Sequence, residues 1–124
     1  MTSAHKNRGL IERLGFACSG LMQCWQEENS FRFQSLAAVG VIVALLVLRP
    51  PLIWAALVIL IASLILCVEL FNSALERLAD AFDSNANPQI RAAKDMAAGA
   101  VLILASTSVI LGLFLLLVIL KGSS

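Results

Sequence analysis

The sequence predicts an all-α membrane protein in which an N-terminal amphipathic surface helix is followed by three transmembrane helices. The first reason is composition: 60% of the residues are hydrophobic and only 14% are charged, whereas about 25% of a soluble domain is charged. The second reason is that three apolar stretches have transmembrane length. At 124 residues, the chain is expected to be one domain, residues 1–124. Its net charge of +1 does not indicate a nucleic-acid partner, and none is expected.

The surface helix is expected over residues 7–28, and residues 1–6 are expected to be disordered. Apolar residues recur in this segment at steps of three and four, which is the spacing of one helix face. They are Leu10, Ile11, Leu14, Ala17, Cys18, Leu21 and Trp25. Basic residues and Trp25 suit such a helix to a membrane surface. A soluble helix packed on the bundle is the alternative, and the two are compatible.

The three membrane helices are expected over residues 31–48, 52–82 and 89–120. A Pro-Pro pair ends the first of them, because two prolines force an extended turn. The second begins with seventeen residues, 52–68, that contain no charge and continues into an acidic segment. The connection at 83–88 is rich in Asn, Asp and Pro, which favour turns.

Basic residues are divided unequally between the two ends of these helices. Seven lie at one end, namely Lys6, Arg8, Arg13, Arg32, Arg77, Arg91 and Lys94, and two lie at the other, namely Arg49 and Lys121. Cytoplasmic segments carry an excess of Lys and Arg. The N-terminus and the connection at 83–88 are therefore expected to face the cytoplasm.

A polar stripe follows the uncharged segment of the second membrane helix. Its residues Glu69, Asn72, Ser73, Glu76 and Asp80 are spaced i, i+3, i+4, i+7 and i+11, so we expect them to share one helix face. Along the axis, Glu69 and Glu76 would lie roughly 10 Å apart. Ionisable groups at a membrane are costly and are commonly functional. We therefore favour a chemical role for the stripe over a solvated helix end.

Three polar segments are expected to converge at the cytoplasmic boundary, namely residues 27–32, 69–80 and 91–95. Their carboxylate and amide oxygens suit Mg²⁺, which usually takes one or two carboxylates together with substrate phosphates. Their Lys and Arg side chains suit the phosphates. A carboxylate at the hydrocarbon edge, such as Glu69, could accept a proton from a lipid hydroxyl. Because phosphoryl transfer requires mainly positioning and charge stabilisation, this set of residues favours a kinase that acts on a membrane alcohol.

The glycines and cysteines do not form standard sites. Gly15 and Gly20 have the spacing of a P-loop, but Leu21 and Met22 stand where lysine and serine or threonine are required. The three cysteines lack ligand spacing and histidine partners, and we expect them to be buried apolar residues. Two other protein classes remain open. A proton- or ion-translocating subunit would use Glu69 as its relay carboxylate, and a membrane scaffold would carry out no chemistry.

Two motifs support the kinase interpretation. The first is Glu69-Leu-Phe-Asn72-Ser73-Ala-Leu-Glu76-x-x-x-Asp80, and the second is Lys94-Asp95-Met-Ala-Ala-Gly-Ala-Val-Leu. Together they resemble the small bacterial diacylglycerol kinase family, which includes the undecaprenol kinases, and the resemblance extends from about Gly15 to the end of the third membrane helix. It implies a homotrimeric bundle in the bacterial cytoplasmic membrane, with the active site facing the cytoplasm. It also implies ATP as co-substrate and Mg²⁺ as cofactor.

The resemblance also implies roles for single residues. Glu69 corresponds to the catalytic base, and Glu28 and Glu76 correspond to the metal ligands. The positions that correspond to ATP contacts are Phe16, Glu28, Asn72, Glu76, Asn85, Ala86, Asn87, Lys94 and Asp95. The positions that correspond to lipid contacts are Phe31, Arg32, Glu69 and Ala98. The sequence departs from the family at Phe16, where tyrosine is common, and at Gly9, where an arginine contacts nucleotide and where Arg8 or Arg13 is expected to substitute.

The lipid substrate is expected to be diacylglycerol, giving phosphatidic acid, because this is the family's commonest assignment. Undecaprenol is the alternative. Ala98, followed by Gly99, stands where members specific for diacylglycerol often carry serine. This pair, together with Asn29-Ser30-Phe31-Arg32, is closer to the undecaprenol branch.

Overall fold

The computed structural model describes residues 3–82 and 87–122. These residues form the four helices α1 (Ser3–Glu27), α2 (Asn29–Leu48), α3 (Leu52–Asp80) and α4 (Pro88–Leu120). Helices α2, α3 and α4 are long and apolar enough to cross a membrane, which confirms the predicted fold class. The prediction that residues 1–6 are disordered is wrong for residues 3–6, because α1 already begins at Ser3.

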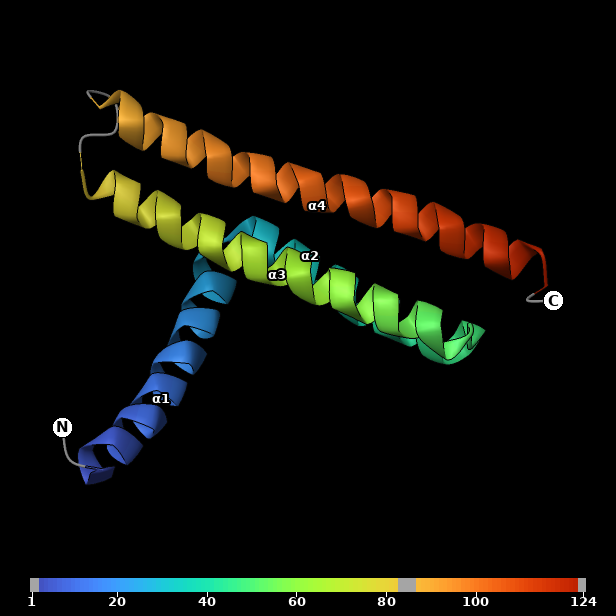
Figure 1. Cartoon of the computed structure of the whole chain (residues 1–124), viewed down its shortest axis with the longest axis horizontal. Coiled ribbons are helices and arrows are strands. Elements are labelled where there is room, and N and C mark those ends of the chain that lie inside the picture. Colours follow the sequence, from blue (N-terminus) through green and yellow to red (C-terminus); the bar gives the residue numbers. More distant parts are fainter. Residues whose placement is uncertain (1–2, 83–86, 123–124) are drawn as a thin grey trace.

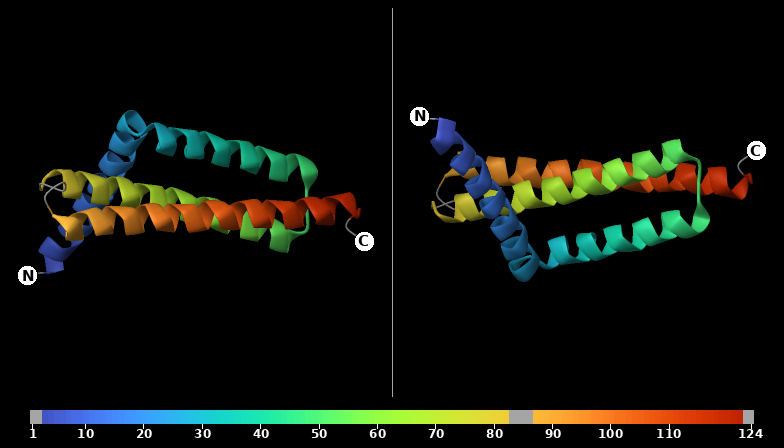
Figure 2. Two further views of the ribbon diagram at one scale, coloured as in Figure 1. Left: turned by 90° about the horizontal axis from the view of Figure 1, so that it is seen from above. Right: turned by 90° about the horizontal axis from the view of Figure 1, so that it is seen from below.

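Helix α3 lies at the centre of the bundle and packs against both α2 and α4. Figure 1 shows α3 and α4 side by side, with α2 behind α3. In Figure 2, α2 and α3 run antiparallel and are joined at the end distant from α1. Helix α1 leaves the bundle at a steep angle, toward the end where α3 finishes and α4 begins. The end of α1, the start of α2 and the last turns of α3 therefore meet at one end of the molecule.

The helix boundaries have local causes. Glu28 has an extended backbone, which separates α1 from α2 by a single residue. Helix α2 ends at Leu48 and is capped by Arg49, which adopts a left-handed conformation and donates its backbone N–H to the carbonyl of Leu45. The two prolines follow. At the start of α4, the side chain of Asn87 accepts a hydrogen bond from the backbone N–H of Gln89, and Pro88 occupies the first turn.

Few side chains are buried within this single chain. In the described part they are Cys24, Phe31, Val58, Glu69, Ser73 and Ala79. Large apolar side chains are instead exposed along α2, α3 and α4. Since α2 and α4 pack on α3 rather than on each other, an open apolar groove of about 360 Å³ lies between the three helices. Exposed apolar surface of this extent is typical of a chain that faces lipid or other chains.

The cysteines differ from the prediction. Cys24 is buried, but Cys18 and Cys67 are exposed. The reason is that Cys18 lies on α1, which diverges from the bundle, and Cys67 lies on a membrane helix with much of its apolar surface uncovered. An apolar residue on such a helix need not be buried by protein.

Candidate functional site

Polar side chains gather where the junction of α1 and α2 meets α3. Four of the six buried residues in the described part belong to this place, namely Cys24, Phe31, Glu69 and Ser73. Two of the four are polar, and both lie on α3. Buried polar groups in a membrane protein are expensive unless they are paired. Within the described residues, this buried cluster therefore combines two apolar side chains with two polar ones.

Glu69 is the buried acid of this region. It is 6% exposed, and its Oε2 accepts a hydrogen bond of 3.2 Å from the hydroxyl of Ser30. Ser30 is the second residue of α2, so the carboxylate lies beside the first turn of that helix. The N-terminus of a helix carries partial positive charge. Helix α2 thus supplies both a hydrogen bond and a favourable dipole to the carboxylate of Glu69.

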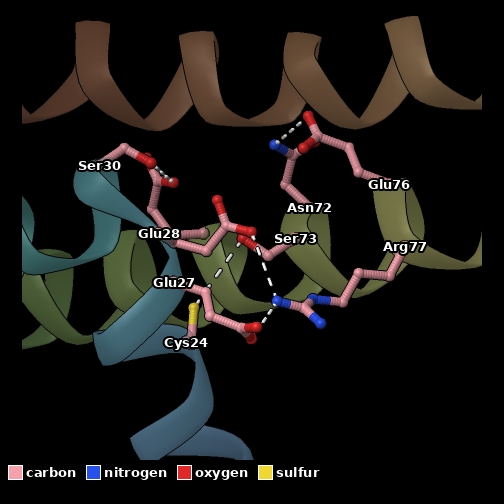
Figure 3. Close-up of polar contacts among 9 residues, drawn as sticks. Cys24, Glu27, Glu28, Ser30, Asn72, Ser73, Glu76 and Arg77 are labelled. Carbon is pink, nitrogen blue, oxygen red and sulfur yellow. Dashed lines mark hydrogen bonds and ion pairs between the residues drawn. The ribbon is translucent and has the colours of Figure 1, made fainter. Parts of the chain in front are cut away.

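The polar stripe lies on one side of helix α3, as its spacing predicts, but it faces two different neighbours. Residues Glu69, Ser73 and Arg77 contact α1 and α2. Residues Asn72, Glu76 and Asp80 form an adjacent row, and Figure 3 shows Glu76 close under α4. Each row follows the i, i+4 spacing, and the rows are offset by one helix position. Because both rows lie on the same side of α3, the spacing of the residues in the sequence did not show that they face different helices.

The row that faces α1 holds this helix against α3. The thiol of Cys24 donates to the hydroxyl of Ser73 over 3.9 Å, and burial raises the pKa of this thiol, so it stays protonated. Nη2 of Arg77 lies 2.5 Å from Oε2 of Glu27 and 3.9 Å from Oε1 of Glu28 (Figure 3). The hydrogen bond from Arg77 lowers the pKa of Glu27, so the pair is formed at neutral pH and is lost only in acid.

The row that faces α4 contains an unsatisfied polar atom. Nδ2 of Asn72 donates to Oε1 of Glu76 over 3.2 Å, while Oδ1 of Asn72 is buried without a hydrogen-bond partner. Nζ of Lys94, on α4, lies 3.5 Å from Oδ1 of Asp80. A buried acceptor with no donor is uncommon in a folded protein. Its position beside a carboxylate is suited to a ligand that supplies positive charge.

The residues of this second row fit a magnesium ion in part. Oδ1 of Asn72 and the carboxylate of Glu76 are hard oxygen donors, which Mg²⁺ prefers. Among the described residues, no group of three or more His, Cys, Asp or Glu side chains is arranged to hold a metal. The carboxylate of Glu28 lies 3.9 Å from Nη2 of Arg77 (Figure 3). The protein would thus supply few ligands itself, as in sites where substrate phosphates supply the others.

The remaining predicted site residues lie in varied surroundings. Phe31 is buried, at 5% exposure, and Arg32 is half-buried and donates to the side chain of Asn29. Phe16, Asp95 and Ala98 are exposed. Asn87 is exposed and caps α4, so its side-chain oxygen is already engaged. Asn85 and Ala86 lie outside the described residues, and so does the side chain of Arg8.

Three side chains that contact the predicted site were not expected from the sequence. Ser30, Cys24 and Arg77 were not singled out, although all three contact the predicted site. Arg77 continues the i, i+4 row of Glu69 and Ser73, and this spacing was a usable signal. Ser30 and Cys24 lie more than thirty residues away from their partners in the sequence, and their contacts depend on how α1 and α2 dock on α3.

The ion pair between Arg77 and Glu27 gives a test of how α1 is docked. In Arg77→Glu, like charges would face each other, and we expect amide hydrogen exchange of residues 20–27 to accelerate by up to about five-fold, since exposed pairs are weak. The charge-swapped double variant Glu27→Arg, Arg77→Glu should return to the parent rate. Arg91→Glu, on α4, is the matched control. Equal exchange in the single and double variants would contradict the pairing.

Comparison with known proteins identifies the family. The family model described as prokaryotic diacylglycerol kinase matches residues 15–116. The chain belongs to the prokaryotic diacylglycerol kinase family. This result confirms the resemblance carried by the two motifs, and the match covers all four helices in part or whole.

Individual relatives within the family carry two names. The undecaprenol kinase of Bacillus subtilis is 32% identical, over 79% of this chain and 80% of its own. The diacylglycerol kinase of Escherichia coli K12 is 33% identical, over 82% of this chain and 83% of its own. The diacylglycerol kinase of Helicobacter pylori 26695 is 35% identical, over 90% of this chain and 88% of its own. These identities are too similar to favour one lipid.

Proposed function

We propose that the protein transfers the γ-phosphoryl group of ATP to the hydroxyl of a membrane lipid. Membership of the prokaryotic diacylglycerol kinase family makes it a lipid kinase that uses ATP. The observation that carries the assignment of the reacting groups is the buried Glu69 at the end of an uncharged membrane segment, with one carboxylate oxygen held by Ser30. There, a lipid hydroxyl arrives from the membrane and the nucleotide from the cytoplasm.

Glu69 is the proposed general base. It would accept the proton of the lipid hydroxyl as that oxygen attacks the γ-phosphorus, and ADP would leave with the bridging oxygen. Oε2 is engaged by Ser30, and the carboxylate makes no second hydrogen bond to a described residue. An acceptor oxygen within reach of the hydroxyl is the geometric requirement for base catalysis. Burial also excludes water, which would otherwise compete as acceptor.

The proposed nucleotide site lies between α3 and the start of α4. Asn72 and Glu76 would hold Mg²⁺, with Glu28 reaching the ion from the junction of α1 and α2. When bound, this ion would neutralise charge on the phosphates. Lys94 and Asp95 would contact the nucleotide, and the 3.5 Å separation of Lys94 from Asp80 places its ammonium group beside the acidic row. Phe16, Asn85, Ala86 and Asn87 are the further nucleotide contacts that we propose.

Diacylglycerol is the lipid that we propose, with phosphatidic acid as product and with Phe31, Arg32 and Ala98 as lipid contacts. Undecaprenol is the second candidate, because a relative named undecaprenol kinase matches as well as those named diacylglycerol kinase. The exposed methyl group of Ala98 offers no hydrogen bond to a glycerol ester, and this favours the second candidate. An assay in which the two lipids compete for the same enzyme distinguishes the candidates, because the true substrate should receive most of the transferred phosphate.

We propose a homotrimer in the bacterial cytoplasmic membrane as the working form. The apolar side chains exposed on α2, α3 and α4, and the groove between these helices, support contacts with lipid and with further copies. The excess of basic residues at the α1 end supports a cytoplasmic location for the site.

The proposed orientation is tested by labelling single cysteines with a reagent that does not cross membranes. The background must lack native cysteines, because Cys18 and Cys67 are exposed. A cysteine at the exposed position Arg49 should react in intact spheroplasts, and one at the exposed position Gln89 only after lysis. Reaction of the second position in intact cells would invert the orientation and would place the site in a compartment without ATP.

A proton- or ion-translocating subunit was the other class expected to use Glu69, and the family match supports the lipid kinase instead. ATP consumption by the purified protein separates the two functions. A lipid kinase consumes ATP in proportion to the lipid alcohol supplied, and phosphate appears in the lipid. A translocating subunit yields no phosphorylated lipid.

A further inference from the structure

Ser30 stands out among the residues around Glu69. It is not part of either motif, and it lies 39 residues before Glu69 in the sequence. The fold nevertheless places its hydroxyl 3.2 Å from Oε2 of Glu69 in a partly buried hydrogen bond. We propose that Ser30 is the positioning residue that orients the carboxylate of Glu69. This inference rests on the proposed function, in which Glu69 is the base.

A hydrogen bond to one oxygen of a carboxylate restricts the orientation of the plane of the carboxylate group. Without that bond, the group can rotate about its last side-chain torsion, whose energy profile is broad. With Oε2 fixed by Ser30, the other oxygen points in a limited range of directions and is free to accept a proton, since it makes no hydrogen bond to a described residue. Rates of proton and group transfer fall steeply when a reacting group is displaced by about 1 Å. Fixing the plane therefore affects the chemical step more than substrate binding.

The position of Ser30 in α2 suits this role. As the second residue of the helix, it is in the first turn, where backbone N–H groups lack helical acceptors and the dipole is positive. The next residue, Phe31, is 5% exposed and anchors this turn in the protein. The serine hydroxyl is thus attached to a rigid support. A short hydroxyl side chain can donate to the carboxylate without displacing it, whereas alanine cannot donate at all.

The test compares Ser30→Ala and Ser30→Thr with the parent protein in mixed micelles. The lipid used is diacylglycerol in one series and undecaprenol in the other. We expect kcat of Ser30→Ala to fall about 10- to 100-fold, the range for a lost hydrogen bond to a charged group, with KM for ATP and KM for lipid unchanged. Ser30→Thr keeps the hydroxyl and should retain most of kcat. Ser35→Ala is the matched control, because Ser35 also lies on α2 and makes no hydrogen bond within the described residues.

A second arm repeats Ser30→Ala in the Glu69→Gln background. If Ser30 acts through Glu69, its removal should not lower the residual rate further, because groups that act as a unit are not additive. The inference is overturned by a parent-like kcat in Ser30→Ala, by an equal loss in both backgrounds, or by a change confined to KM for lipid. A parent-like rate in Glu69→Gln itself would instead remove the base and with it the proposed function. Nucleotide binding, measured for each variant, establishes that the protein is folded.

Discussion

Glu69→Gln should lower kcat for lipid phosphorylation about 10²- to 10⁴-fold, the usual contribution of a general base. The amide has the shape of the carboxylate, and its oxygen can still accept the hydrogen bond from Ser30, so the packing of α2 on α3 is expected to persist. It cannot take the proton of the lipid hydroxyl. Binding of ATP should survive, because Glu69 is not one of the proposed nucleotide contacts. The loss should therefore be confined to the chemical step.

Two further variants test whether the loss comes from the missing carboxylate at position 69. Glu69→Asp keeps the charge but withdraws the carboxylate by one methylene, and a displacement of about 1 Å can cost about 10²-fold. Glu12→Gln makes the same chemical change on an exposed position of α1 and should leave the rate unchanged. If Glu69→Gln turned over at the parent rate, the base would have to be another residue.

Glu76→Gln is expected to have the second large effect. Its side-chain oxygen can still accept the hydrogen bond from Asn72, so the local structure is kept while one negative charge is removed. We expect activity at low Mg²⁺ to fall at least about 10- to 100-fold, the loss seen when even an outer partner of a metal ligand is removed. Raising the Mg²⁺ concentration should restore part of the activity, because the defect lies in affinity.

The measurement for Glu76 is a magnesium titration of the initial rate. Glu28→Gln should behave in the same way if Glu28 turns from Arg77 toward the ion when nucleotide is bound, and Glu12→Gln again serves as the control. Near-normal activity of Glu76→Gln at low Mg²⁺ would exclude it as a metal ligand. A loss that extra Mg²⁺ does not reverse would assign Glu76 a different role at the nucleotide.

The sequence predicted the helices well because their signals are local. Uncharged stretches of membrane length and the Pro-Pro pair require no knowledge of the tertiary fold. The break between α1 and α2 was expected at residues 29–30 and lies at Glu28. Its exact place was harder to predict, because the helical pattern of α1 continues almost to the first membrane helix and only one residue separates the two. The start of α1 at Ser3 was not predicted, because the first residues of this helix lack the apolar pattern that indicates an amphipathic helix.

The positions of the acids on α3 could be predicted, but their surroundings could not. The spacing of Glu69, Asn72 and Glu76 places them on one side of α3 in any helical structure. Which neighbour each acid faces depends on the packing of α3 between α2 and α4, which helical periodicity does not specify. The contact of Ser30 with Glu69 and the unsatisfied oxygen of Asn72 are consequences of that packing.

The most direct test of the account is the transfer of radiolabelled phosphate from ATP to lipid by the purified protein. The assay offers diacylglycerol and undecaprenol in mixed micelles, with and without Mg²⁺, to the parent and to Glu69→Gln, and nucleotide binding is measured in parallel. We predict that labelled lipid forms only when both a lipid alcohol and Mg²⁺ are supplied. In Glu69→Gln, the rate should fall about 10²- to 10⁴-fold while ATP binding is retained. Labelled lipid formed at the parent rate by Glu69→Gln, or no labelled lipid from a parent protein that binds ATP, would contradict it.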